Sequence, residues 1–171
     1  MSDRLPASAA AIEIADYLRS RYFGKYRGIA REVDAATMRV RALVPALGDA
    51  VTGWATACVP YAGPGVGVVM LPEVDSGVWI EFEAGDISYP IWSGCYWREG
   101  EVPEDAAEDA KAIFTKAGSL VLSDADSSLT LEDADGHKVV VDGDGVLIAG
   151  DSGKIAVGSK VSINDGALDV S

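Results

Sequence analysis

The final third of the chain repeats a short apolar pattern that restricts how it can fold. Between residues 118 and 171, pairs of apolar residues separated by one residue recur, and successive pairs start 9, 10, 7, 9, 6 and 7 residues apart. Residues two apart in a strand lie on the same face, and the Asp and Gly clusters between the pairs favour turns. The pattern therefore predicts seven short strands, each with two apolar side chains on one face. The pairs are Leu120/Leu122, Leu129/Leu131, Val139/Val141, Val146/Ile148, Ile155/Val157, Val161/Ile163 and Leu168/Val170.

Strands of this length cannot enclose a core within one chain. Two apolar side chains per strand bury too little surface to offset the entropy of ordering the segment, and short strands leave backbone edges open. We expect three copies to wind around one axis, with each strand paired to a neighbouring chain and the apolar pairs filling a narrow triangular core. Residues 118–171 are thus predicted to form a three-stranded β-helix in a homotrimer, with Leu168 and Val170 at its tip.

The N-terminal region, residues 1–24, is predicted to contain a helix. The stretch "SAAAIEIADYLRSRYF", residues 8–23, is rich in alanine, Ser8 suits the N-cap, and Gly24 suits the end. Ile14, Leu18 and Tyr22 recur at intervals of four and predict one apolar stripe. Two interpretations stay open for this stripe, namely packing on its own domain or docking onto another protein.

Residues 25–98 are predicted to form a small closed β-barrel. Six short apolar runs are bounded by Gly, Pro or Asp, and closure into a barrel removes exposed edges. In "VWIEFE" the side chains of Val78, Ile80 and Phe82 are expected on one face, with Trp79, Glu81 and Glu83 on the other. The six runs are "KYRGIAREV", "TMRVRALVP", "GWATACVPYAG", "GVGVVMLPEV", "SGVWIEFEAGD" and "YPIWSGCYW".

Three further expectations concern the tryptophans, the cysteines and the segment after this barrel. All four tryptophans, residues 54, 79, 92 and 97, are expected in the barrel core or at interfaces. Cys58 and Cys95 are expected to be buried free thiols, as in a reducing compartment, and a disulfide stays open as the alternative. Residues 99–117, "EGEVPEDAAEDAKAIFTKA", are predicted to be an acidic connector.

The charge of the chain disfavours several classes of partner. The formal net charge is −13, whereas binding to nucleic acid or to anionic lipid needs clustered Lys and Arg. The N-terminus does not have the pattern of a signal peptide, and no apolar run approaches the length of a membrane span. We therefore expect synthesis in a cytoplasm and no nucleic-acid partner.

Candidate catalytic and metal-binding residues are scarce. The only histidine, His137, lies in the predicted turn "DGHK". Any Ser/His or Cys/His catalytic pair would have to use this turn residue as its base. The aspartates between the pairs stand at turn positions, and "DADSSLTLEDAD" lacks the central Gly and final Glu of an EF-hand loop. We expect no enzyme activity, catalytic residue, cofactor or metal. An ion on the axis of the predicted β-helix, residues 118–171, called here the stem, stays open as an alternative.

A longer pattern resembles one family. The segments "KYRGIAREVD", "MRVRALVPAL", "GWATACVPYAG" and "GVGVVMLPEVDSGVWIEFEAGDISYPIWSGCYW" resemble the phage baseplate assembly protein V family, the central spikes of contractile phage tails, which are related to spikes of type VI secretion. The resemblance implies an oligonucleotide/oligosaccharide-binding (OB) barrel that contacts protein partners, followed by a three-stranded β-helix in a homotrimer. Some members end in an iron-binding His-x-His tip. Because His137 lies in the middle of the stem, no iron tip is expected here.

The expected function is therefore mechanical, within an all-β fold that begins with one helix. The helix and barrel are expected to sit on the central hub protein of a baseplate, in a virion or a related injection particle, after synthesis in the host bacterial cytoplasm. The stem is expected to carry a separate PAAR-like tip protein and to pierce the target envelope on sheath contraction, so that it contacts the membrane only transiently. The alternatives are a monomeric OB-fold module that binds oligonucleotide or oligosaccharide, and an envelope hydrolase.

Overall fold

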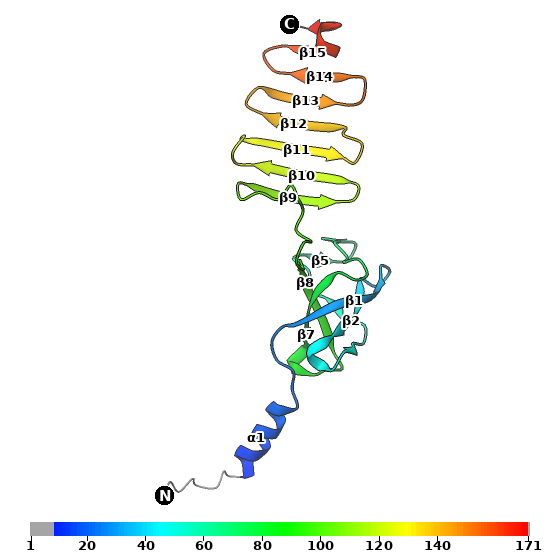
Figure 1. Ribbon diagram of the computed structural model, residues 1–171, viewed down its shortest axis with the longest axis vertical. Coiled ribbons are helices and arrows are strands. Elements are labelled where there is room, and N and C mark those ends of the chain that lie inside the picture. The colour runs from blue at the N-terminus through cyan, green and yellow to red at the C-terminus, as the bar shows by residue number, and fades with distance from the viewer. Residues whose placement is uncertain (1–8, 171) are drawn as a thin grey trace, which may run out of the picture. The chain divides into compact units, whose positions relative to one another are not determined.

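The computed structural model describes residues 9–170, and its contacts divide the chain into two units, Met1–Glu101 and Val102–Ser171 (Figure 1). The first unit contains the helix α1 (Ala9–Arg19) and a curled sheet. The second contains one antiparallel sheet of eight strands. The described residues are thus mostly β structure with one short α-helix, as the sequence predicts.

Helix α1 ends earlier than expected. It stops at Arg19 and not at Phe23, and the proposed N-cap Ser8 lies outside the described residues. Tyr22 follows the helix, and its backbone N–H donates to the Gly85 carbonyl at 2.8 Å. Its ring lies 5.9 Å from that of Phe82 and 6.4 Å from that of Tyr26. Tyr22 therefore packs on the barrel and does not belong to the helical stripe.

The curled sheet of the first unit has the strand order β3-β2-β1-β7-β8-β4. A bridge between Val40 and Ala55 brings the segment before β4 back to β2, which curls the sheet toward a barrel. Two 3₁₀ turns, η1 (Pro45–Leu47) and η2 (Glu83–Gly85), follow β2 and β7. The strands are β1 (Tyr26–Asp34), β2 (Arg39–Val44), β3 (Ala50–Val51), β4 (Thr56–Ala57), β7 (Gly77–Phe82) and β8 (Pro90–Tyr96).

The hydrophobic core lies inside this curled sheet. Val78 and Ile80 are fully buried and Phe82 is 6% exposed, so the predicted alternation of "VWIEFE" is confirmed. Among the tryptophans only Trp92 lies in the core. Trp54 and Trp97 are exposed, and Trp79 lies outside the core with its ring tilted against that of Tyr96. The core is formed by Ala30, Val40, Ala42, Val44, Ala55, Val78, Ile80, Phe82 and Trp92.

Two expectations for this unit were wrong. Cys58 and Cys95 are free but exposed; an apolar run does not determine which way a side chain faces, and the pairing of β7 with β8 shifts register between Val78 and Ile80, close to Cys95. The run "GVGVVMLPEV" supplies only β6 (Val66–Gly67), which pairs with β5 (Ala62–Gly63) in a separate hairpin. The rest of that run lies on the surface without strand structure as far as Met70.

The second unit is a meander in which every strand pairs with the next one along the chain (Figure 1). The segment expected as a connector, residues 99–117, contains its first strand. The expectation that each strand pairs with a neighbouring chain was wrong, because the strands extend beyond the apolar pairs and satisfy one another within one chain. The strands are β9 (Ala110–Thr115), β10 (Gly118–Ser123), β11 (Ser128–Asp133), β12 (Lys138–Asp142), β13 (Gly145–Ala149), β14 (Lys154–Val157), β15 (Val161–Ile163) and β16 (Leu168–Val170), with the 3₁₀ turn η3 (Asn164–Gly166) before the last.

Candidate assembly surface

The register of the second sheet aligns all seven apolar pairs into two continuous ladders. Residues that pair directly across antiparallel strands lie on the same face, so these residues share one side of the sheet, called here the ladder face. The first ladder runs Ile113, Leu120, Leu131, Val139, Ile148, Ile155, Ile163, Leu168. The second runs Leu122, Leu129, Val141, Val146, Val157, Val161. The backbone of Val170 continues this register opposite Val161, but its side chain lies outside the described ones.

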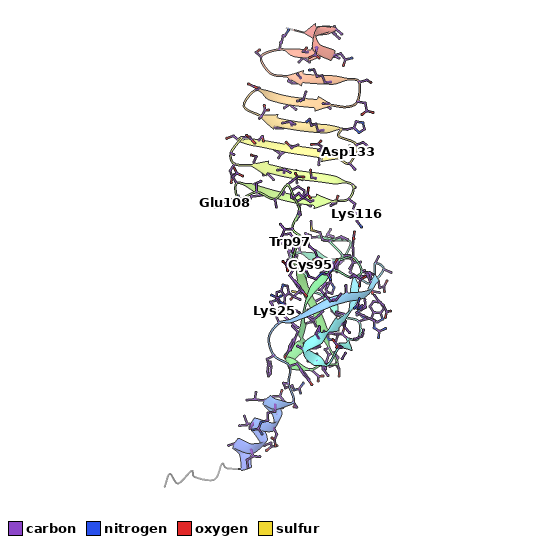
Figure 2. All side chains as sticks on the ribbon, viewed as in Figure 1. Lys25, Cys95, Trp97, Glu108, Lys116 and Asp133 are labelled. Carbon is purple, nitrogen blue, oxygen red and sulfur yellow. The ribbon has the colours of Figure 1, made fainter. Side chains whose placement is uncertain are left out.

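The ladder face is open to solvent in a single chain. Leu131 is 54% exposed, Ile148 48% and Leu122 45%. No described side chain of the second unit is buried to the degree found in the barrel core, and Figure 2 shows the strands as a single layer. A continuous apolar surface of this kind marks an interaction site.

The opposite face has a different composition. Its central line contains Val121, Thr130, Val140, Leu147 and Ala156, which are directly paired in that order. Polar and charged residues border this line on both sides, including Ser119, Glu132, Lys138 and Lys154 on one side and Ser123, Ser128 and Asp142 on the other. Because only the ladder face presents two adjacent apolar lines, it is the face suited to burial.

Aspartate and serine side chains close the turns at the strand ends. The Asp142 carboxylate accepts the backbone N–H of Asp144 at 2.9 Å and that of Gly145 at 3.3 Å. The Ser123 hydroxyl oxygen accepts the N–H of Asp126 at 3.1 Å. These are the local turn functions for which Asp and Ser are favoured.

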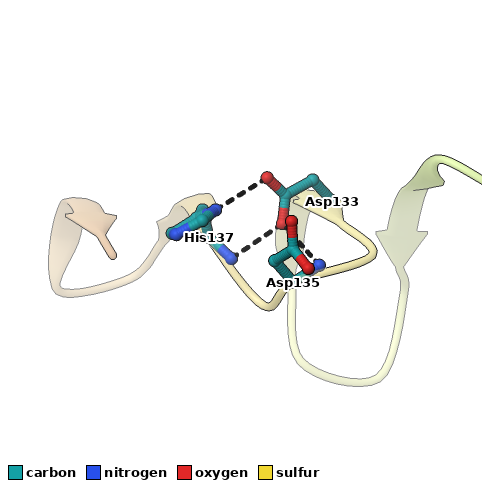
Figure 3. Close-up of side chains that lie close together, drawn as sticks. All are labelled: Asp133, Asp135 and His137. Carbon is teal, nitrogen blue, oxygen red and sulfur yellow. Dashed lines mark hydrogen bonds and ion pairs between the residues drawn. The ribbon is translucent and has the colours of Figure 1, made fainter. Parts of the chain in front are cut away.

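The one histidine lies at such a turn, between β11 and β12 (Figure 3). The Asp133 carboxylate accepts the backbone N–H groups of Asp135 and His137 at 2.9 and 3.0 Å, and its other oxygen lies 2.8 Å from His137 Nδ1. His137 Nε2 lies 3.5 Å from the carboxylate of Asp151, in the loop between β13 and β14. His137 thus connects two turns along one side of the sheet.

These contacts change the acidity of both partners. The hydrogen bond to Asp133, together with the negative charges of Asp133 and Asp151, raises the pKa of His137. The hydrogen bond from His137 lowers the pKa of Asp133. Single ligand atoms of Asp133, Asp135 and His137 lie within 4.8 Å of one another, and all three residues are exposed. Asp133 and His137 already make the hydrogen bonds that close the turn. The arrangement of these residues is therefore that of a hydrogen-bonded turn.

Helix α1 carries a second exposed apolar surface. Ile14 is 61% exposed and Leu18 52%, and their spacing of four places them on one side of the helix. Tyr17, also 52% exposed, lies next to Leu18 in the chain. Of the residues predicted for docking, Ile14 and Leu18 therefore remain available, whereas Tyr22 is occupied by the barrel. Among the helices described, none is long and apolar enough to cross a membrane.

Sequence reasoning missed one member of the ladder face. Ile113 pairs with Leu120 at the start of the first ladder. Its partner position in β9 on the same face is Lys111, which pairs with Leu122. Because β9 has one apolar residue and not two on this face, it lacks the repeated pair, and only the alternation in "KAIFT" could have indicated a strand.

Comparison with protein families assigns both units. Residues 26–97 match the family described as the type VI secretion system/phage-baseplate injector OB domain. Residues 112–169 match the phage baseplate V C-terminal trimerisation domain. No curated protein matches the chain. The first match confirms the predicted OB barrel, and the second supports self-association as a homotrimer through the unit that carries the ladder face.

Proposed function

Because the chain belongs to the phage baseplate assembly protein V family and is a baseplate structural protein, we propose that three copies form the central spike of a contractile tail or injection baseplate. The observation that carries the proposal is the ladder face, a two-residue-wide apolar surface that one chain leaves open.

In the spike, three sheets pack their ladder faces together around one axis. Each strand contributes two residues, which suits a narrow core with three sides. The core residues are Leu120, Leu122, Leu129, Leu131, Val139, Val141, Val146, Ile148, Ile155, Val157, Val161 and Ile163, together with Ile113. Burial of each such side chain contributes about 1.5–3 kcal/mol, which a single chain cannot gain.

The stem acts as a rigid needle that pierces the target envelope on sheath contraction. Its stiffness has two sources: hydrogen-bonded ladders within each sheet and apolar packing between sheets. The acidic turns do not attract anionic lipid headgroups, so contact with the membrane is transient. The proposal assigns no catalytic role to any residue.

The two units take different partners. Ile14 and Leu18 of α1, with the OB barrel, bind the central hub protein of the baseplate. In the second unit β16 is the last strand of its sheet, and Leu168 is 55% exposed. A PAAR-like tip protein covers the three copies of this edge at Leu168 and Val170, since an uncovered strand edge invites uncontrolled pairing. The protein reaches the baseplate of its particle after synthesis in the host bacterial cytoplasm.

The alternative of a monomeric OB module for oligonucleotide or oligosaccharide has less support, given the net charge of −13 and the match to a trimerisation domain. Size-exclusion chromatography with light scattering separates the two. The spike predicts three times the chain mass of 17.8 kDa at micromolar concentration. A folded monomer at that concentration would contradict it.

A further inference from the structure

A long stretch of the first unit carries no charge although the chain is strongly acidic. Residues 50–72 contain no Asp, Glu, Lys or Arg, in a protein with a net charge of −13. Residues 61–70 of this stretch, called here the apolar loop, are exposed throughout. Within it Tyr61 is 58% exposed, Val66 53%, Val69 73% and Met70 57%.

The apolar loop is held in a defined conformation. Its β5–β6 hairpin turns at Gly65, which has a φ of 73°, and the Val68 N–H donates to the Tyr61 carbonyl at 3.0 Å. Val59 before the loop and Leu71 after it pack against the barrel core. The apolar side chains are therefore presented from a fixed base, and the surface is preorganised for a partner.

We propose that the apolar loop packs against the barrel of a neighbouring copy in the homotrimer, which makes it a second interface between protomers. This inference rests on the trimer of the proposed function. It adds a contact in the OB units to the one formed by the ladder faces.

The segment that connects the two units favours a second copy of the chain as the partner of the apolar loop. Residues 98–111 connect the matched OB domain to the matched trimerisation domain, and fourteen residues span at most about 50 Å. Three barrels are therefore confined near one another once the stems associate, at an effective concentration on the order of millimolar. Even a weak apolar contact is populated under these conditions.

Charge gives the second reason. Copies with a net charge of −13 repel one another, and burying an unpaired charge is costly. Most of that charge follows residue 98, because residues 25–98 hold eight Asp and Glu and six Lys and Arg, a net charge of −2. The uncharged apolar loop lets two barrels meet without burying any of these charges. The depletion of charge over residues 50–72 also matches the composition of protein interface cores.

The test uses single thiols in the full chain. Cys58→Ser and Cys95→Ser remove the two exposed native thiols, and Val69→Cys then places one in the apolar loop. Ile87→Cys is the matched control, because Ile87 is a 45% exposed apolar residue of the same unit outside the loop. After light scattering confirms trimers, we expect the Val69→Cys thiol to react with maleimide several-fold more slowly than the Ile87→Cys thiol.

Three results would overturn the proposal. In confirmed trimers, equal labelling rates of the Val69→Cys and Ile87→Cys thiols would overturn the contact while leaving the spike intact. Protection of the thiol only after a baseplate partner is added would assign the loop to that partner. A monomeric parent protein, recognised by its mass, would overturn the trimer and this contact with it.

Discussion

Adjacent side chains in the second sheet have opposite expected roles, and Val141 and Val140 provide the sharpest case. Val141 belongs to the ladder face and Val140 to the opposite face of the same strand. Val141→Asp places three carboxylates together near the proposed axis, where each unpaired buried ion costs several kcal/mol. We expect Val141→Asp to abolish trimers in light scattering, and Val140→Asp to retain them.

The pair of variants also controls for damage to the strand, because both introduce the same residue at neighbouring positions. Trimers that survive Val141→Asp would show that this residue faces outward. Loss of trimers in both variants would indicate that the sheet itself had failed, and circular dichroism would detect that failure as lost β signal.

The contact between His137 and Asp133 predicts a pH dependence. The hydrogen bond to Asp133 raises the pKa of His137 in the folded protein, so the contact contributes stability that is fully present below the unfolded value of about 6.5 and is lost as pH rises through the folded value. We expect the unfolding temperature of the parent to fall across this window by more than that of His137→Gln.

The measurement is a thermal unfolding series from mildly acidic to mildly alkaline pH at constant salt. Parallel curves for the parent and His137→Gln would show that the contact does not contribute. A steeper fall in the variant would reverse the sign of the linkage and contradict the geometry of Figure 3.

Among the larger elements, the hairpins of the stem depend on glycine where two strands approach closely. Gly145 begins β13 with a φ of 133°, and a Cβ there would overlap the Val157 carbonyl oxygen of the neighbouring strand. Gly145→Ala should therefore lower the free energy of unfolding by about 1–3 kcal/mol, measured by urea denaturation at fixed protein concentration. Gly143→Ala in the same turn is the control, since nothing lies within 4 Å of its Cβ position. Equal effects of the two substitutions would contradict the argument.

Helix α1 gives a prediction that separates assembly from docking. Leu18→Asp removes an exposed apolar side chain from the helix and touches no residue of the ladder face. We expect trimers of normal mass that are not incorporated into baseplate particles, assayed by immunoblotting of purified particles. Glu13→Gln on the same helix should be incorporated normally. Normal incorporation of Leu18→Asp would assign the hub contact to another surface.

The elements that sequence predicted correctly were those fixed by periodicity. The seven apolar pairs fall into register across the sheet because residues two apart share a face and the short turns keep neighbouring strands in line. Trp92 and the alternation of "VWIEFE" were likewise placed correctly in the barrel.

The failures had other physical causes. Tyr22 continued the helical spacing, but aromatic partners on the barrel determined its position. Strand β9 was missed because Lys111 interrupts its apolar pair. Pairing between chains was expected because only the apolar residues were counted as strand, whereas the strands extend beyond them. The apolar pair on one face of each strand could be predicted from sequence, but the partner of each strand could not.

Considered as a whole, the trimer brings together three chains that each carry a net charge of −13. Repulsion among them opposes association, and added salt screens it over about 10 Å at 0.1 M. We expect the trimer to unfold at higher temperature in moderate salt than at low ionic strength, measured by calorimetry. A decrease with salt would mean that ion pairs such as Arg21–Asp86 contribute more than the repulsion costs.

The meander of the stem has a consequence for the evolution of its reach. Each strand pairs only with the strands before and after it in the chain, so a hairpin is a self-contained increment of about 10 Å along the stack. In the proposed spike, duplicating or deleting one hairpin would change the length of the stem without altering the unit proposed to meet the hub or the last strand proposed to carry the tip. Spikes proposed to pierce envelopes of different thickness would therefore adjust in length by whole hairpins.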